Sequence, residues 1–251
     1  MKYIQIERDG EIAVLTLTRP PVNAIDLEIL KEADEAVGEL TADEAVGSIV
    51  LTGAGRCFCA GLDLKVVPFY EAGRQREYIE LVNRIITSVF AAPRPTVAAV
   101  NGPACAGGFI LMMCCDYRIG AMGEYPLGVT EARVGIPFPV STLEVLRQEL
   151  SHPVFRRLLL TGLNHGPERA LEWGILDELH SPENLLARAK EVAADLATLP
   201  REPFNRIKRQ VKGDAIARIE SVVERGEPML ESWIVGEGRE GAADMIERVK
   251  E

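Results

Sequence analysis

The chain has 251 residues and a formal net charge of −10, with 38 acidic side chains against 28 basic ones. This balance argues against attraction of the whole surface to nucleic acid or anionic lipid, so an anionic ligand must be bound by local features. The longest apolar stretch, residues 109–115, is too short to span a bilayer, which takes about 20 residues. The first residues alternate like a strand and contain no secretory segment, so we expect a cytoplasmic protein that binds neither nucleic acid nor membranes.

The five cysteines are Cys57, Cys59, Cys105, Cys114 and Cys115. An odd number without a secretion signal argues against a disulfide framework. A C-x-C pair with no second pair of ligands is also poor zinc spacing, and the three histidines are scattered. We therefore interpret the cysteines as small buried apolar residues and expect no metal.

The first elements are a β-hairpin and a helix. Residues 2–8 and 11–18 alternate on either side of Asp9-Gly10, a strong two-residue turn signal. Asp26 is placed to cap a helix that runs to about Leu40. Next, periodicity predicts a strand at 48–52, a polar and mobile loop containing Pro68 and Gly73, a helix at 74–90, strands at 96–100 and 117–119, and a helix at 108–115.

The remainder of the chain is mostly helical. Ser141 followed by Glu144 predicts a capping box that opens a helix. Further helices are predicted at 153–161, 167–173, 182–198, 203–212 and from 214 onward. Strand–strand–helix units followed by helices indicate a layered α/β fold with a helical extension.

Two glycine segments, CFCAGLDL at 57–64 and NGPACAGG at 101–108, each follow a predicted strand. Small residues there allow a ligand to approach the backbone and leave amide donors free. Taken singly, each segment is most simply a tight turn. Two such donors that converged would bind a developing oxyanion. Neither segment has the pattern of a phosphate loop.

Three motifs together give the chain a family resemblance. They are FCAGLDL, VNGPACAGGFILMMCCDYRI and GVTEARVGIPFP, in this order and spacing. With them the sequence resembles the crotonase (enoyl-CoA hydratase/isomerase) superfamily over essentially its whole length. Within it the sequence is most similar to the enoyl-CoA delta isomerases, which share AGLDL, CDYRI and a lone acidic residue.

The resemblance implies an α/β fold, a crotonase-like spiral of ββα units with a C-terminal helical trimerisation region. The spiral core would span residues 1–195 and the helical region residues 196–251, with a homotrimer or dimer of trimers as the assembly. Such enzymes bind acyl-CoA thioesters, whose CoA is part of the substrate. They stabilise the enolate with two backbone N–H groups, and the matching positions are Ala60 and Gly107.

The resemblance also implies which acid–base groups are present. Hydratases carry two glutamates, one to activate water and one to handle the proton that reaches carbon. The first of these positions holds Ile110, and the second holds Glu131. An apolar pocket would raise the pKa of Glu131 toward neutrality. We therefore expect Glu131 to shuttle one proton and convert a 3-enoyl-CoA into a 2-enoyl-CoA.

Contacts with the acyl-CoA follow from the same resemblance. Asp63 has a second interpretation, as a helix cap. Arg248 near a phosphate is weighed against a solvated helix face. The implied substrate-binding residues are Val22, Ala24, Leu62, Asp63, Leu64, Gly108, Met245 and Arg248.

Three other functions stay open on the sequence alone. The first is an enoyl-CoA hydratase with a compensating acid elsewhere. The second is another crotonase reaction, such as decarboxylation or thioester hydrolysis. The third is a non-catalytic scaffold that binds acyl-CoA or RNA, although the charge of −10 weighs against RNA. The sequence does not define the length of the acyl chain.

Overall fold

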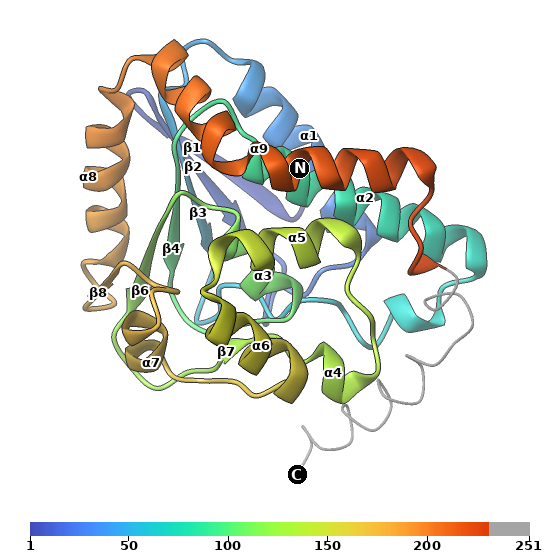
Figure 1. Cartoon of the computed structure of the whole chain (residues 1–251). Helices are drawn as coiled ribbons and strands as arrows, with labels where there is room; N and C mark the ends of the chain where they lie inside the picture. Colours follow the sequence, from blue (N-terminus) through green and yellow to red (C-terminus); the bar gives the residue numbers. More distant parts are fainter. Residues whose placement is uncertain (231–251) are drawn as a thin grey trace.

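A six-stranded sheet lies at the centre of the structure, a computed structural model that describes residues 1–230 (Figure 1). Its strand order is β1-β2-β3-β4-β6-β8; β1 and β2 are antiparallel, and the other neighbours are parallel. The strands are β1 (Ile4–Asp9), β2 (Ile12–Leu17), β3 (Ser48–Gly53), β4 (Thr96–Val100), β6 (Tyr117–Ala121) and β8 (Glu178–His180), and β5 (Ala104–Cys105) pairs with β7 (Leu127–Gly128) in a second sheet.

Helices cover both faces of the large sheet. The described helices are α1 (Leu27–Ala42), α2 (Ala72–Phe90), α3 (Gly107–Met113), α4 (Glu131–Val134), α5 (Val140–Glu149), α6 (His152–Thr161), α7 (Pro167–Glu172), α8 (Leu185–Ala197), α9 (Arg201–Arg225) and the 3-10 turn η1 (Val67–Phe69). None of the helices within residues 1–230 is long and apolar enough to cross a membrane. The layered α/β architecture expected from the sequence is confirmed.

Successive side chains of β2 point to opposite faces of the sheet, and each face packs against its own layer of helices. Ile12 and Val14 belong to the apolar cluster that α8 covers on one face. Ala13 and Leu15, which point the other way, belong to the larger core with residues of α1 and α2. Because both faces are buried, the central strands are almost continuously apolar, as is usual in parallel sheets. The predicted hairpin is also present, with Asp9 opposite Ile12 and Gly10 at a φ of 60°.

Several predicted boundaries were correct and others were wrong. Asp26 caps α1, accepting hydrogen bonds from two amides of its first turn. The segment interpreted as a mobile loop instead forms η1 and the start of α2, where the Glu71 carboxylate accepts hydrogen bonds from the amides of Gly73 and Arg74. The helices predicted on either side of residue 213 are one continuous helix, α9, because Gly213 is tolerated inside it.

The predicted capping box is wrong as well. Helix α5 begins at Val140, one residue before Ser141, and Ser141 is a buried residue of the first turn. The Glu144 carboxylate does not turn back to the helix start but pairs with the guanidinium groups of Arg147 and Arg218. A carboxylate from elsewhere in the chain, Glu227, accepts the Val140 amide at 2.9 Å.

Helix α9 is tied to the end of α3 by a buried ionic cluster. Lys208 Nζ lies 2.7 Å from one carboxylate oxygen of Asp116, and Lys212 Nζ lies 2.9 Å from the other. Both ammonium groups also donate to backbone carbonyls, of Arg94 and Cys114. Removing one partner of such a buried pair is strongly destabilising, so the aspartate of the CCDYRI motif serves to hold α9.

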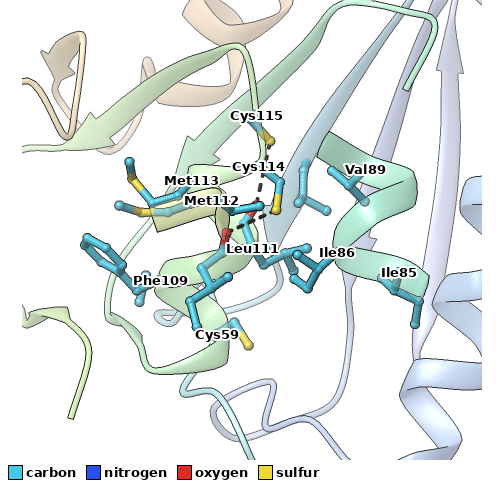
Figure 2. Close-up of a cluster of buried hydrophobic side chains, with 14 of the residues drawn as sticks. Cys59, Ile85, Ile86, Val89, Phe109, Leu111, Met112, Met113, Cys114 and Cys115 are labelled. Carbon is cyan, nitrogen blue, oxygen red and sulfur yellow. Dashed lines mark hydrogen bonds between the residues drawn. The ribbon is translucent and has the colours of Figure 1, made fainter. Parts of the chain in front are cut away.

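Figure 2 shows the packing of α3 against α2, with Ile86 on the side of α2 that faces Leu111. The cysteines that follow α3 are buried, and the Cys114 thiol donates to the carbonyl of Ile110 at 3.2 Å. Cys57 and Cys59 are also buried, and burial raises the pKa of the Cys59 thiol to about 12. The interpretation of these four as packing residues is confirmed, whereas Cys105 is only partly buried.

Candidate active site

The two glycine segments meet beyond the carboxyl ends of β3 and β4, the edge of an open parallel sheet where ligands bind. Cys59 pairs with Ala104 in an isolated parallel bridge, and Ile25 pairs with Leu62 in another. The Ile25 amide donates to the carbonyl of Gly61 at 2.7 Å, and the Asp63 amide donates to the carbonyl of Ile25 at 2.9 Å. These bonds place the residues after β3 directly beside the start of α3.

The free amides at this junction are those of Leu62 and Gly107. Since the bridge uses the carbonyl of Gly61 and the amide of Asp63, the Leu62 N–H points away from Ile25 and finds no acceptor within residues 1–230. Gly107 is the first residue of α3, so its N–H has no partner inside the helix. A Cβ atom on Gly107 would lie 3.9 Å from the Leu62 nitrogen, which places the two amides side by side.

This geometry corrects one predicted site residue. The Ala60 N–H was expected to be the partner of Gly107, but it donates to the carbonyl of Val22 at 3.0 Å. Leu62, expected only as a substrate contact, supplies the unpaired donor instead. The signal in the sequence for this shift is the glycine at position 61, because glycine readily adopts a positive φ. In the structure Gly61 has a φ of 82°, which redirects the chain just before the Leu62 amide.

Close packing at Gly61 requires a glycine. A Cβ atom there would lie 2.6 Å from the Cys105 carbonyl oxygen and 2.9 Å from the Gly107 nitrogen. Ala106, just before Gly107, has a φ of 50° and a ψ of −124°, which is a strained conformation for a residue with a side chain. Such strain is retained where the surrounding structure fixes it, and here it orients the first amide of α3.

A cavity of about 190 Å³ opens at the paired amides. Most of its lining side chains are apolar, and Leu62, Gly107, Ile110 and Glu131 all contribute to it. Ile110, three residues after Gly107, is 2% exposed and presents only hydrocarbon. The other lining residues near this end are Ala60, Leu64, Cys105, Ala106, Thr130, Val134, Ile136, Pro137, Phe138, Pro139, Thr142 and Asn164.

Glu131 is the first residue of α4 and carries the one carboxylate among the described lining residues. Its Oε2 atom is buried and has no hydrogen-bond partner within residues 1–230. Burial raises the pKa of this carboxyl from 4.5 to about 7, although the backbone amides of Glu131 and Thr130 oppose the shift. The predicted increase toward neutrality is confirmed, and a group with this pKa exchanges protons readily at physiological pH.

Asn164 and Asn23 were not identified from the sequence. Asn164 lines the cavity, and its carboxamide can donate or accept a hydrogen bond but cannot titrate. Asn23 is 1% exposed, and its Nδ2 atom donates to the carbonyls of Ala54, Cys57 and Phe58. It therefore fixes the loop that leads to the Leu62 amide. The only sequence signal for Asn23 was its position within RPPVNAI, which gives no indication of partners so distant in the chain.

The other expected acyl-CoA contacts are distributed around the same loop. Leu64 lines the cavity, whereas Val22 and Ala24 do not. The carbonyl of Val22 accepts hydrogen bonds from the Cys57 thiol and the Ala60 amide, and the carbonyl of Ala24 accepts one from the Arg19 guanidinium. Contact of Val22 and Ala24 with CoA stays a prediction.

Asp63 and Gly108 have structural roles in the described chain. The Asp63 carboxylate accepts hydrogen bonds from Arg19 Nη2 at 2.8 Å and from the Lys65 amide at 3.1 Å. Its interpretation as a helix cap is wrong, because Lys65 belongs to a turn and η1 begins later, with Val66 as its N-cap. A Cβ atom on Gly108 would lie 2.1 Å from the Cys59 carbonyl oxygen, so Gly108 permits close packing and does not line the cavity. Met245 and Arg248 lie outside the described residues.

Comparison with known proteins identifies the family of this chain. The family model described as enoyl-CoA hydratase/isomerase matches residues 7–251. The short-chain-enoyl-CoA hydratase of Clostridium acetobutylicum is 32% identical over 77% of this chain and 74% of its own. Enoyl-CoA delta isomerase 1 of Rattus norvegicus is 30% identical over 79% and 70%, and 4-chlorobenzoyl coenzyme A dehalogenase-2 of an Arthrobacter species is 30% identical over 88% and 82%.

Solved structures give the same result. The crystal structure of human mitochondrial delta3-delta2-enoyl-CoA isomerase superposes with a TM-score of 0.92 at 25% identity, covering 99% of this chain and 98% of the human one. The resemblance to isomerases found in the sequence is thereby confirmed, as is the crotonase fold. The chain belongs to the enoyl-CoA hydratase/isomerase family of enzymes.

Proposed function

We propose that the protein is an enoyl-CoA isomerase that moves the double bond of a 3-enoyl-CoA to the 2-position by a proton shuttle on Glu131. The observation that carries this proposal is the combination of one buried carboxylate, Glu131, with the two unpaired amides of Leu62 and Gly107 around one apolar cavity.

The amide pair supports binding of the thioester oxygen. In this role the Leu62 and Gly107 N–H groups donate to the oxygen as negative charge develops on it. Donors that are already fixed in place need no reorganisation during the reaction, and each is worth about 3 kcal/mol of transition-state stabilisation. Helix α3 is short, but its dipole also favours negative charge at the Gly107 amide.

Glu131 then performs both proton transfers. The ionised carboxylate takes a proton from C2, and the electron pair of that C–H bond delocalises onto the thioester oxygen. The protonated carboxyl returns the proton to C4, which shifts the double bond to C2–C3 and restores the carboxylate. A carboxyl with a pKa of about 7 suits both steps, because neither of its protonation states is strongly disfavoured near neutral pH.

Ile110 supports isomerisation over hydration. Addition of water needs a second group that handles a proton, and the position three residues after Gly107 has an alkyl side chain that cannot do so.

The decisive experiment compares Glu131→Gln with wild type on 3-hexenoyl-CoA, following the absorbance of the conjugated thioester. Glutamine keeps the shape of the side chain but accepts no proton, so we expect a loss of at least about 1,000-fold in kcat. Glu124→Gln, on the exposed side of the loop before β7, is the matched control and should match wild type. Activity retained by Glu131→Gln would disprove the assignment of the base.

Hydration is the second candidate, because curated hydratases are among the relatives at 32% identity. The same two proteins should be tested on crotonyl-CoA, where hydration removes the conjugated absorbance. The proposal requires hydration to be far slower than isomerisation for wild type. Comparable rates on both substrates would make the protein a hydratase, with a proton donor other than Ile110.

A further inference from the structure

Arg19 lies in the segment between β2 and α1 and binds three acceptors close to the Leu62 amide. Its Nη1 atom donates to the carbonyl of Ala24 at 3.0 Å, and its Nη2 atom donates to Asp26 Oδ2 at 2.9 Å and to Asp63 Oδ2 at 2.8 Å. The three ionic side chains are largely buried, with 18% of Arg19, 10% of Asp26 and 12% of Asp63 exposed. Charge-assisted hydrogen bonds at such burial are stronger than surface ion pairs, so the guanidinium fixes these segments relative to one another.

The loop that Arg19 holds is the one that carries the Leu62 amide. Leu62 directly precedes Asp63 and pairs with Ile25 in the isolated bridge, where the Asp63 amide donates to the Ile25 carbonyl at 2.9 Å. On the other side of the bridge, Ile25 lies between the other two residues that accept hydrogen bonds from Arg19. The guanidinium therefore connects both sides of the bridge through groups other than the Leu62 N–H, which is left available to a ligand.

The carboxylates of Asp26 and Asp63 would repel each other without this guanidinium. Both accept from the same Nη2 atom, so their Oδ2 oxygens lie within a few ångströms of each other in a site that is mostly shielded from water. Asp26 is fixed, because its other oxygen caps the first turn of α1. Asp63 lies in a loop and binds the Lys65 amide through its other oxygen. Loss of Arg19 would therefore displace Asp63 rather than Asp26, and the preceding Leu62 would move with it.

We propose that Arg19 is a positioning residue of the active site: it holds the Leu62 amide beside the Gly107 amide and so controls how well the pair stabilises an enolate. The guanidinium does not line the cavity and transfers no proton. Its effect is geometric, because a hydrogen bond weakens steeply when its donor turns away from the acceptor. The inference rests on the proposed function in taking the two amides as the donors to a thioester oxygen.

Acetoacetyl-CoA tests the paired amides without turnover. It has no double bond to move, and it ionises between its two carbonyl groups to an enolate that absorbs in the near ultraviolet. A pH titration of this absorbance gives the pKa of the bound ligand, with each variant made in a Glu131→Gln background so that this carboxyl does not titrate. Arg19→Met should raise the pKa of the bound ligand by about one unit, a loss of about tenfold in enolate stabilisation. The affinity for butanoyl-CoA, which forms no stable enolate, should stay within about twofold, as measured by calorimetry.

Kinetics on 3-hexenoyl-CoA, with Glu131 in place, should give the same order. Arg19→Met should lower kcat at least about tenfold, with KM within about threefold of wild type. The double variant Arg19→Met/Asp63→Asn should recover at least about threefold of this loss, because it removes the unpaired carboxylate. It also carries the test if Arg19→Met alone fails to fold, with an expected rise of about half a unit in the pKa of bound acetoacetyl-CoA. Arg8→Met, which removes an exposed pair with Asp43 at 2.7 Å, is the matched control and should reproduce wild type.

The possible failures are distinguishable. An unchanged pKa of bound acetoacetyl-CoA in variants that are merely less stable to urea would make Arg19 a structural residue and overturn the inference. Equal weakening of butanoyl-CoA and of the enolate would also overturn it, because the whole substrate site would then be disturbed and not the amide alone. A raised pKa in Arg19→Met together with full activity of Glu131→Gln would support the role of Arg19 and overturn the proposed chemistry.

Discussion

The carboxylate of Glu227 accepts a hydrogen bond of 2.9 Å from the backbone amide of Val140, the first residue of α5. The same Oε2 atom accepts a second hydrogen bond of 2.9 Å from Asn83 Nδ2 in α2, and Asn83 Oδ1 in turn accepts the amide of Ser141. Glu227, which follows α9, thus links α2 to the start of α5. The two residues just before α5, Phe138 and Pro139, line the cavity.

We predict that Glu227→Ala weakens substrate binding more than it slows the chemistry. Two partly buried donors would lose their acceptor, at up to about 1–3 kcal/mol each, and the segment from Ile136 to Pro139 would lose its support. The Michaelis constant should rise several-fold while kcat changes less than twofold. Glu227→Gln keeps an acceptor oxygen, so it should recover most of the loss, and equal behaviour of the two variants would contradict a positioning role.

The pH dependence of the reaction should report the raised pKa of Glu131. The carboxylate is the active form of the base, so kcat/KM for isomerisation should rise about tenfold per pH unit below pH 7 and level off above it. A steady-state series from pH 5 to 9 on 3-hexenoyl-CoA measures this profile. A profile that is flat down to pH 5.5 would mean that the carboxyl has its ordinary pKa and that burial does not control it.

The same burial predicts an effect on stability. The folded-state pKa of about 7 exceeds the unfolded value of 4.5, so the folded protein binds this proton more tightly. The resulting stabilisation is fully present below pH 4.5 and is lost as the pH rises through 7. Glu131→Gln carries no charge and should therefore exceed wild type by about 3 kcal/mol in free energy of unfolding at pH 8, with the difference disappearing near pH 4.

Urea unfolding of both proteins at several pH values measures this difference. Effects of all other groups cancel in the comparison, because the two chains differ at one side chain. A Glu131→Gln variant that is no more stable than wild type at pH 8 would show that the carboxylate is solvated. If the prediction holds, the wild-type enzyme at pH 8 is less stable than its inactive Glu131→Gln variant, which is the usual cost of a buried catalytic charge.

Gly107→Ala separates the role of the paired amides from folding. A Cβ atom there meets the Ile25 side chain at 3.5 Å and the Leu62 nitrogen at 3.9 Å, which are ordinary contacts, so the fold should tolerate it. The methyl group would nevertheless enter the space that the thioester oxygen needs, and kcat/KM should fall about 100-fold. Gly38→Ala, in open space on α1, is the matched control and should keep full activity. Loss of stability in Gly107→Ala, without a specific loss of activity, would contradict the prediction.

The sequence predicts most of the layered fold because its signals there are local. The alternation of residues 11–18 and the cap at Asp26 each depend on a few neighbouring residues, and both appear in the structure as expected. Glu131 and Gly107 could be proposed as site residues because the family resemblance implies their positions, and burial of Glu131 follows from the apolar residues beside it.

The errors come from contacts between distant segments. Whether Ala60 or Leu62 offers the free amide depends on the pairing of Val22 and Ile25 with this loop, which no local pattern specifies. The predicted cap at Ser141 failed for the same reason, since Glu227 satisfies the start of α5 from another part of the chain. The cavity at Glu131 depends on which core side chains leave space between them, and apolar periodicity alone does not distinguish a filled core from a hollow one.

Strain at Ala106 predicts that replacing an alanine by glycine raises the free energy of unfolding at this position and lowers it at an unstrained alanine. With a φ of 50° and a ψ of −124°, Ala106 occupies a region that costs on the order of 1–3 kcal/mol for a residue with a Cβ atom. Ala106→Gly removes that strain but adds freedom to the unfolded chain, worth about 0.4–1 kcal/mol. The variant should therefore gain about 1 kcal/mol in free energy of unfolding, with kcat/KM within about threefold of wild type, because the Gly107 amide keeps its neighbours.

Ala54→Gly is the matched control for this test. Ala54 also lies in a loop after a strand, but its φ is not positive, so glycine relieves nothing there and only the cost in the unfolded chain remains. We expect Ala54→Gly to lose about 0.5–1 kcal/mol where Ala106→Gly gains, as measured by urea unfolding. Equal losses in free energy of unfolding for both variants would mean that Ala106 is not strained. Strain at Ala106 would then not explain how the Gly107 amide is oriented.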